Sequence, residues 1–312
     1  MKRCLTKRAL DVWDSVVFSS IFLASGFSCS QAESTPIHTP VTQAVSRSKL
    51  KNKGLAMNIS EHNRLAWNKE VKKGNVWTIP VNKDELETAA KGEYKIVLTP
   101  YKPVPKNWLG DITGKNILCL ASGGGQQGPI LAAAGAHVTV FDNSDEQLKK
   151  DEEVSEEFNL HIKTVRGNMQ DLSCFADKTF YMIIHPVSNC FIDDILPVWK
   201  ESYRVLDENG CLLSGFSNPL MYMIDWEEAE ETKRCELKHS IPYSDIRSLS
   251  PSMKQKYIQE KMPFEFGHTL TDQIQGQIEA GFVITGFYED RGEELFDRYT
   301  NIFIATRAIK QR

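Results

Sequence analysis

Short apolar segments alternate with amphipathic segments through the middle of this chain. The apolar segments have the length and composition of buried strands, and they lie at 116–121, 137–142, 161–167, 179–187 and 210–217. The segments between them have the spacing of helices that bury one face, and they lie at 128–136, 144–159 and 193–206. Alternation of this kind builds a parallel sheet covered by helices on both faces.

The pattern changes after residue 217. The polar segment 218–268 carries interleaved aromatic residues, which either line a ligand pocket as a lid or pack the segment onto the sheet. A helix is predicted at 269–281, followed by two strands at 282–290 and 301–309 with no helix between them. We therefore predict an α/β, Rossmann-like, doubly wound sheet of seven mostly parallel strands, with an antiparallel last strand pair and an inserted lid.

Charge divides the chain near residue 56. Residues 1–56 contain eight Lys and Arg against three Asp and Glu, although the whole chain has a net charge of -4. Their apolar run, 16–27, is shorter than the roughly 20 residues that span a bilayer. We interpret 1–56 as a leader, either a targeting peptide or a disordered extension, unless translation begins at Met57. The folded domain is expected at 57–312.

Composition excludes several classes of function. The acidic balance gives no electrostatic basis for binding nucleic acid or an acidic membrane. The seven cysteines form no C-x-x-C pair, so neither a zinc site nor a disulfide framework is expected. Reduced, mostly buried thiols are typical of a reducing compartment, and we expect a cytoplasmic protein unless residues 1–56 direct it to an organelle or to export.

A glycine-rich loop follows the first predicted strand. Gly123, Gly125 and Gly128 fit G-x-G-x-x-G between a strand and a helix, and Asp142 ends the second strand 19 residues after Gly123. Glycines allow a tight turn and close approach of a ligand, while the amides at the helix start favour an anionic group. An acid in this place can bind ribose hydroxyls. The pattern predicts an adenosine-type cofactor; the alternative is a glycine-rich turn without a ligand.

The residues from 116 to 217 resemble the class I S-adenosylmethionine-dependent methyltransferases of the type 11 kind. The resemblance rests on five stretches, CLASGGG, VTVFDNS, RGNMQDL, TFYMII and VWKESYRVLDENGCLLSG. It implies an enzyme that transfers a methyl group from S-adenosyl-L-methionine to an acceptor that the sequence does not identify. A small molecule is the expected acceptor, and no nucleic-acid partner or stable membrane insertion is expected.

The resemblance also implies roles for individual residues. The methionine end of the cofactor would face Ser122, Gly123 and Gly125, the ribose Asp142, and the adenine Asn143, Asn168 and Met169. Two departures concern the cofactor, because Ala121 and Ser122 stand where the family usually has an acid, and Asn168 replaces an Asp. The N-terminal helix, with Trp67 and Trp77, either closes over the cofactor or covers the sheet.

His185, at the end of the fourth strand, would lie near the reacting methyl group. A histidine has a suitable pKa for a general base, so His185 is the candidate catalytic residue and His268 a weaker one. The alternative is that His185 only packs beside the cofactor.

Two other functions stay open. Tyr257 and Lys261 have the Y-x-x-x-K spacing of short-chain dehydrogenases, which would use NAD(P) in the glycine loop. A methyltransferase fold that binds its cofactor without turnover is the second alternative, because fold alone does not establish activity.

Overall fold

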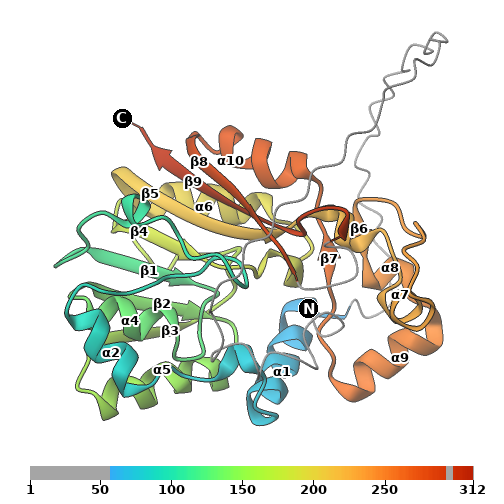
Figure 1. Cartoon of the computed structure of the whole chain (residues 1–312), viewed down its shortest axis with the longest axis horizontal. Helices are drawn as coiled ribbons and strands as arrows, with labels where there is room; N and C mark the ends of the chain where they lie inside the picture. Colours follow the sequence, from blue (N-terminus) through green and yellow to red (C-terminus); the bar gives the residue numbers. More distant parts are fainter. Residues whose placement is uncertain (1–56, 293–297, 312) are drawn as a thin grey trace, which may run out of the picture. The chain divides into compact units, whose positions relative to one another are not determined.

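The computed structural model describes residues 57–292 and 298–311; the predicted leader lies outside the described residues. Seven strands form one sheet in the order β3-β2-β1-β4-β5-β9-β8 (Figure 1). Their bounds are β1 Asn116–Leu120, β2 His137–Asp142, β3 Ile162–Arg166, β4 Phe180–His185, β5 Leu206–Ser217, β8 Phe282–Asp290 and β9 Phe303–Lys310. The predicted seven-stranded α/β sheet is confirmed.

Strand direction creates the place for a ligand. β1 pairs in parallel with β2 on one side and with β4 on the other, so the chain reverses its winding at β1. Ligands of open α/β sheets bind beyond the carboxyl ends of the strands at such a switch point. At the other side of the sheet, β9 runs antiparallel to both β5 and β8, which places the last predicted strand between two neighbours rather than at an edge.

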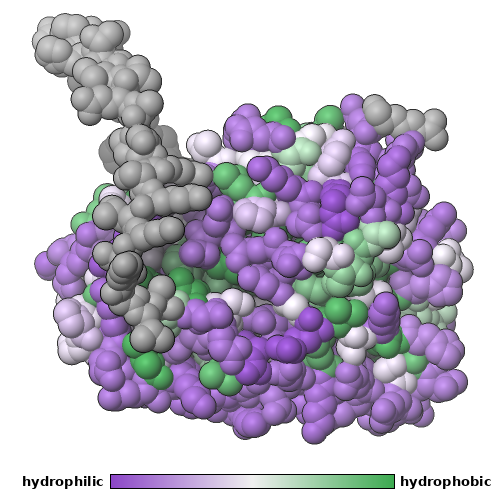
Figure 2. All heavy atoms as spheres, turned by 180° about the vertical axis from the view of Figure 1, so that it is seen from behind, coloured by the Kyte–Doolittle hydropathy of each residue, from purple (hydrophilic) through white to green (hydrophobic). Residues whose placement is uncertain are grey.

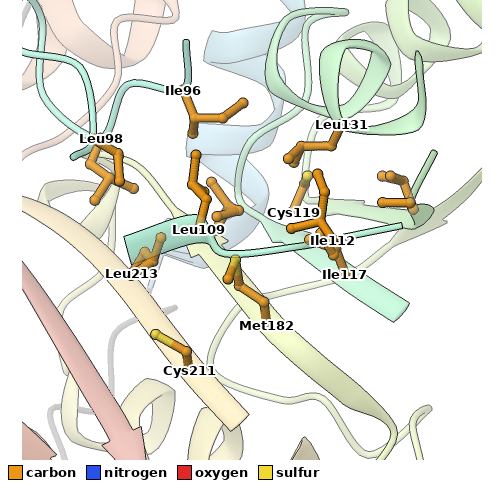
Figure 3. Close-up of a cluster of buried hydrophobic side chains, with 14 of the residues drawn as sticks. Ile96, Leu98, Leu109, Ile112, Ile117, Cys119, Leu131, Met182, Cys211 and Leu213 are labelled. Atoms are coloured by element: carbon orange, nitrogen blue, oxygen red, sulfur yellow. The ribbon is translucent and has the colours of Figure 1, made fainter. Parts of the chain in front are cut away.

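Alternation along the strands divides the core between the two faces of the sheet. Ile117 and Cys119 of β1 join one buried cluster with α4 (Gln127–Ala133), whereas Leu118 and Leu120 join a second cluster with α6 (Leu196–Val205). Figure 3 shows the first cluster between the central strands and the segment that contains Ile96. Both faces of β1 are therefore buried, which explains its continuous apolar sequence.

Helices cover the sheet where the periodicity predicts them, and further helices precede β1. Their bounds are α1 Ile59–Lys72, η1 Val76–Thr78, α2 Lys83–Ala90, α3 Lys106–Leu109, α4 Gln127–Ala133, α5 Asp145–Glu157, η2 Asn189–Phe191 and α6 Leu196–Val205. Ser144, the first residue of the helix predicted at 144–159, caps α5, since its Oγ accepts from the Gln147 amide at 3.2 Å. Asn58 caps α1, because its Oδ1 accepts from the Glu61 amide at 3.0 Å.

The segment from 218 to 268 forms short elements that gather at one end of the sheet (Figure 1). They are η3 Pro219–Tyr222, α7 Trp226–Thr232, α8 Asp245–Ser248, α9 Pro251–Glu260 and a small sheet of β6 Tyr243–Ser244 with β7 Phe266–Gly267. The helix predicted at 269–281 is a π-helical turn, Thr271–Gln275, followed by α10 Gly276–Glu279.

The aromatic residues of this segment pack against one another. Tyr222 stacks on Tyr243 with ring centres 5.6 Å apart, and Tyr257 stacks on Phe264 at 5.5 Å. All four side chains are buried. Of the two alternatives for these aromatics, packing is therefore the one that the structure supports.

Polar residues cover most of the face seen in Figure 2, with hydrophobic residues in separate groups between them. None of the helices in the described part of the chain has the length and apolar character needed to cross a bilayer.

Candidate functional site

A cavity opens beyond the carboxyl ends of β1, β2 and β4, at the switch point of the sheet. About 1100 Å³ of space lies between its walls, open solvent at its mouth included. Strand ends contribute Ala121 to Gly123, Phe141 to Ser144, Gly167 to Met169 and Pro186 to Ser188. Further residues come from α1, η1, α4, α5, η2 and the segment before β1, and they are Ser60, Asn63, Arg64, Trp67, Trp77, Val97 to Pro100, Gln126, Gln127, Gln147, Phe191 and Ile192.

The glycine loop is held from inside the protein by the carboxyl groups of two aspartates. The amide of Gly123 donates to Asp142 Oδ2 at 3.0 Å, and the amide of Gly124 donates to Asp151 Oδ2 at 2.9 Å. Gly124 and Gly125 have φ angles of +115° and +74°, which residues with a Cβ rarely adopt. The amides of Gly123 and Gly124 thus have the protein's own acids as partners.

Asp142 joins this loop to the end of β2. Besides the Gly123 amide, its carboxylate accepts from the Ser144 amide, at 2.8 Å to Oδ1. Burial raises the pKa of Asp142, while hydrogen bonds from neighbouring amides lower it. Each carboxylate oxygen can accept a second hydrogen bond, and Asp142 lines the cavity. The group can therefore receive ribose hydroxyls while it holds the loop.

Asp151 of α5 was not predicted as a site residue. Its side chain is fully buried, and its Oδ1 has no hydrogen-bond partner among the described residues. Burial raises the pKa of Asp151 to about 8, although hydrogen bonds from the amides of Gly124 and Gly125 oppose this shift. The sequence could have indicated Asp151, because this acid lies between Leu148 and Val154 on the buried face of α5, where an apolar residue is expected.

The residues expected at the adenine meet at the cavity wall. Asn143, Asn168 and Met169 all line it. The Asn143 amide donates to the Ser60 carbonyl at 2.8 Å and so ties the end of β2 to α1. Asn168 Oδ1 accepts from the Gln170 amide at 3.0 Å, which shapes the turn after β3.

At the expected methionine end, the structure separates the predicted residues. Ser122 and Gly123 line the cavity. Gly125 is absent from its lining, because the segment after η1 covers it. The Gly125 carbonyl accepts from the Val81 amide at 2.9 Å, and a Cβ on Gly125 would lie 2.9 Å from Pro80 Cβ. We conclude that Gly125 shapes the loop from behind the wall.

His185 is enclosed beneath the cavity and does not line it. Its side chain is fully buried, with Nδ1 2.9 Å from the Leu120 carbonyl oxygen and Nε2 2.6 Å from Asn189 Oδ1. Burial lowers the pKa of His185, although the contacts with the Leu120 carbonyl and the Asn189 side chain oppose this shift. An imidazole with both nitrogens in contact with protein oxygens, and no access to the cavity, argues against the hypothesis of a general base. His268 is buried likewise, and its Nε2 lies 3.0 Å from the carbonyl oxygens of Asn189 and Ile192.

The predicted lid does not reach this cavity, since no residue of 218–268 lines it. The cavity is covered instead by the N-terminal part of the domain, including Trp67 and Trp77. The dehydrogenase alternative loses its catalytic pair for the same reason. Tyr257 is buried in α9, Lys261 follows the end of that helix, and neither lines the cavity.

Comparison with known proteins agrees with this geometry. A family model described as a methyltransferase domain matches residues 118–214. The chain is also 52% identical over 249 residues to "Uncharacterized methyltransferase YbaJ" of Bacillus subtilis (strain 168), a match that covers 80% of this chain and 97% of that protein.

Two solved structures share the fold. An S-adenosylmethionine-dependent methyltransferase from Mesorhizobium loti has a TM-score of 0.52 at 14% identity, over 65% of this chain and 94% of that one. A Burkholderia thailandensis 1,6-didemethyltoxoflavin-N1-methyltransferase, solved with S-adenosylhomocysteine, has a TM-score of 0.52 at 11% identity, over 84% and 93%. The chain belongs to the class I S-adenosylmethionine-dependent methyltransferases, and it is an enzyme whose cofactor is S-adenosyl-L-methionine.

Proposed function

We propose that this methyltransferase acts on a small-molecule acceptor inside the cavity, with its cofactor held by the residues at the ends of β1, β2 and β3. The observation that carries this proposal is the double use of Asp142. Its carboxylate fixes the Gly123 amide and at the same time lines the cavity. One group thus joins the loop expected at the methionine end to the position expected at the ribose.

The residues present fit the cofactor. Asp142 would hold the ribose hydroxyls, Asn143, Asn168 and Met169 would surround the adenine, and Ser122 and Gly123 would face the methionine end. When bound, the cofactor supplies a methyl group on a positively charged sulfur, which is a strong electrophile. The protein's share of the work is then to align the acceptor with that methyl group and to exclude water.

Apolar side chains in the rest of the lining favour a compact acceptor. Trp67 lies edge-on to Phe191 with ring centres 5.1 Å apart, and both line the cavity together with Leu98 and Pro186. Arg64 is a cation in this lining, and its guanidinium is paired with Glu61 and Asp145. Such a wall is typical of small-molecule sites.

For His185 we propose a structural role. The ring bridges the Leu120 carbonyl and the Asn189 side chain, and so it ties the end of β1 to the turn after β4. We further propose that the enzyme works in the cytoplasm, which its free cysteines at 119, 174, 190, 211 and 235 support.

Calorimetry with S-adenosylhomocysteine tests the assignment of Asp142. The Asp142→Ala variant leaves ribose hydroxyls and the Gly123 amide without their acceptor, so we expect binding to weaken by about 1–3 kcal/mol. The matched control is Asp207→Ala, which removes an exposed carboxylate at the amino end of β5. We expect the control to bind like the wild type. An unchanged dissociation constant for Asp142→Ala would remove this residue from the site, and no heat with the wild-type chain would refute the proposed binding site.

A further inference from the structure

Three residues in the cavity wall, Trp77, Thr99 and Gln147, each carry a buried polar side-chain group without a partner among the described residues. Two of these groups are of opposite kind: the indole N–H of Trp77 can only donate a hydrogen bond, and the side-chain oxygen of Gln147 can only accept one. Both of these atoms are shielded from solvent. A buried polar group without a partner costs roughly 1–3 kcal/mol. An unpaired donor and an unpaired acceptor in one wall therefore indicate a ligand that supplies an acceptor for the first and a donor for the second.

Trp77 and Gln147 meet at the glycine loop. A Cβ on Gly124 would lie 2.7 Å from Gln147 Oε1 and 3.0 Å from the Trp77 carbonyl oxygen, so residues from η1 and α5 converge on this one position. The Gly124 amide also lies 3.1 Å from the Gln147 carbonyl oxygen. The Gln147 oxygen and the backbone of Trp77 therefore lie against the loop at which we propose the methionine end of the cofactor.

The chain holds η1 firmly over this loop. Gln126 Nε2 donates to the carbonyl oxygens of Val76 and Ile79, at 3.2 and 3.0 Å, and the Val81 amide donates to Gly125. Trp77 is thus positioned by hydrogen bonds on both sides of it in the sequence. The residues that precede the loop, Ala121 and Ser122, bring no charge to it.

We propose that Trp77 and Gln147 bind the two charged groups of the cofactor's amino-acid end. The Gln147 oxygen accepts from the ammonium group, and the Trp77 indole donates to the carboxylate. This inference rests on the proposed function and extends it to two residues of this chain. A zwitterion matches the pair because it presents a donor and an acceptor side by side, and hydrogen bonds to charged groups are the stronger kind.

The test compares two ligands that differ only in this end. S-adenosylhomocysteine carries the amino-acid group, whereas 5′-methylthioadenosine keeps the nucleoside and the sulfur without it. We expect Trp77→Phe and Gln147→Met each to raise the dissociation constant of S-adenosylhomocysteine about tenfold or more, and to change that of 5′-methylthioadenosine less than about twofold. Asp142→Ala is the contrasting variant, because it should weaken both ligands.

A third ligand separates the two roles. Decarboxylated S-adenosylhomocysteine keeps the amine and lacks the carboxylate, so we expect Trp77→Phe to leave its binding unchanged while Gln147→Met still weakens it. Equal losses for all three ligands, or unchanged binding of S-adenosylhomocysteine by both variants, would overturn the assignment. If the wild type failed to bind S-adenosylhomocysteine at all, the proposed cofactor site itself would fall, which distinguishes the two failures. Melting temperatures of the unliganded variants verify that each is folded.

Discussion

At the scale of single residues, the surroundings of Asp151 shift the pKa of its side chain far from the usual value. The pKa of this buried carboxyl is raised to about 8, because burial outweighs the hydrogen bonds from the glycine loop. An aspartate in an unfolded chain has a pKa of about 3.9. Between these values the folded state holds a proton that the unfolded state has lost. The contribution of Asp151 to stability is therefore complete below about pH 4 and falls as the pH rises to about 8.

Asp151→Asn should remove this pH dependence. The amide keeps an oxygen for the Gly124 N–H and cannot ionise, so the variant gains stability relative to the wild type as the pH rises from 5 to 8. The linkage relation limits the gain to about 1.4 kcal/mol per pH unit. Urea unfolding at several pH values measures it.

The control for this titration is Asp207→Asn, which changes an exposed carboxylate of β5. Its free energy of unfolding should follow that of the wild type over the same range of pH. Parallel curves for Asp151→Asn and the wild type would show that Asp151 is ionised throughout, contrary to the raised pKa.

At the scale of elements, α1 is tied to two other parts of the domain by side-chain amides. Asn63 is buried, and its Nδ2 donates to the carbonyl oxygens of Phe191 and Phe264, at 2.8 and 3.0 Å. Its Oδ1 accepts from the Phe264 amide at 2.9 Å. Asn68, also in α1, accepts from the Ser144 hydroxyl at 2.7 Å through its Oδ1. These bonds hold α1 where Trp67 lines the cavity.

Asn63→Ala tests how much this attachment contributes. The substitution leaves three buried backbone groups without a partner, so we expect the free energy of unfolding to fall by about 2–4 kcal/mol. Asn107→Ala, an exposed asparagine in α3, is the matched control and should stay within about 0.5 kcal/mol of the wild type. A loss no larger than that of the control would mean that water replaces these bonds without cost.

At the scale of the whole domain, the cavity is covered by residues that precede β1 in the chain. α1, η1 and the segment 97–100 line it, while the elements of 218–268 pack among themselves and against other parts of the domain. The order of the sheet explains this division. The site lies at β1, β2 and β4, and the chain enters β1 directly from the N-terminal segments.

Hydrogen exchange with and without S-adenosylhomocysteine should map this cover. We expect amides in 59–81, 121–128 and 142–147 to exchange more slowly with the ligand bound, because these segments surround the cavity. Amides in 226–260 should exchange at unchanged rates. Protection of α7 to α9 without protection of α1 would contradict the structure and restore the segment 218–268 as the lid.

Much of the fold could be predicted from the chain because the signals are local. Continuous apolar runs such as 116–121 indicate strands buried on both faces, and Ser144 marks the start of α5 through a bond to a residue three positions away. The place of β9 between β5 and β8 could not be predicted, because strand order depends on which distant strands pair. The π-helical turn at 271–275 likewise breaks a periodicity that favoured one continuous helix.

The sequence by itself determined the class of fold, the glycine loop and the acid at the end of β2, since each depends on residue types at short, regular spacing. Only the tertiary structure decided that His185 lies beneath the cavity, that Asp151 supports the loop, and that Trp77 and Gln147 meet at Gly124. Those facts depend on which distant segments pack together, and close packing of side chains is a property of the assembled domain that no short stretch of sequence contains.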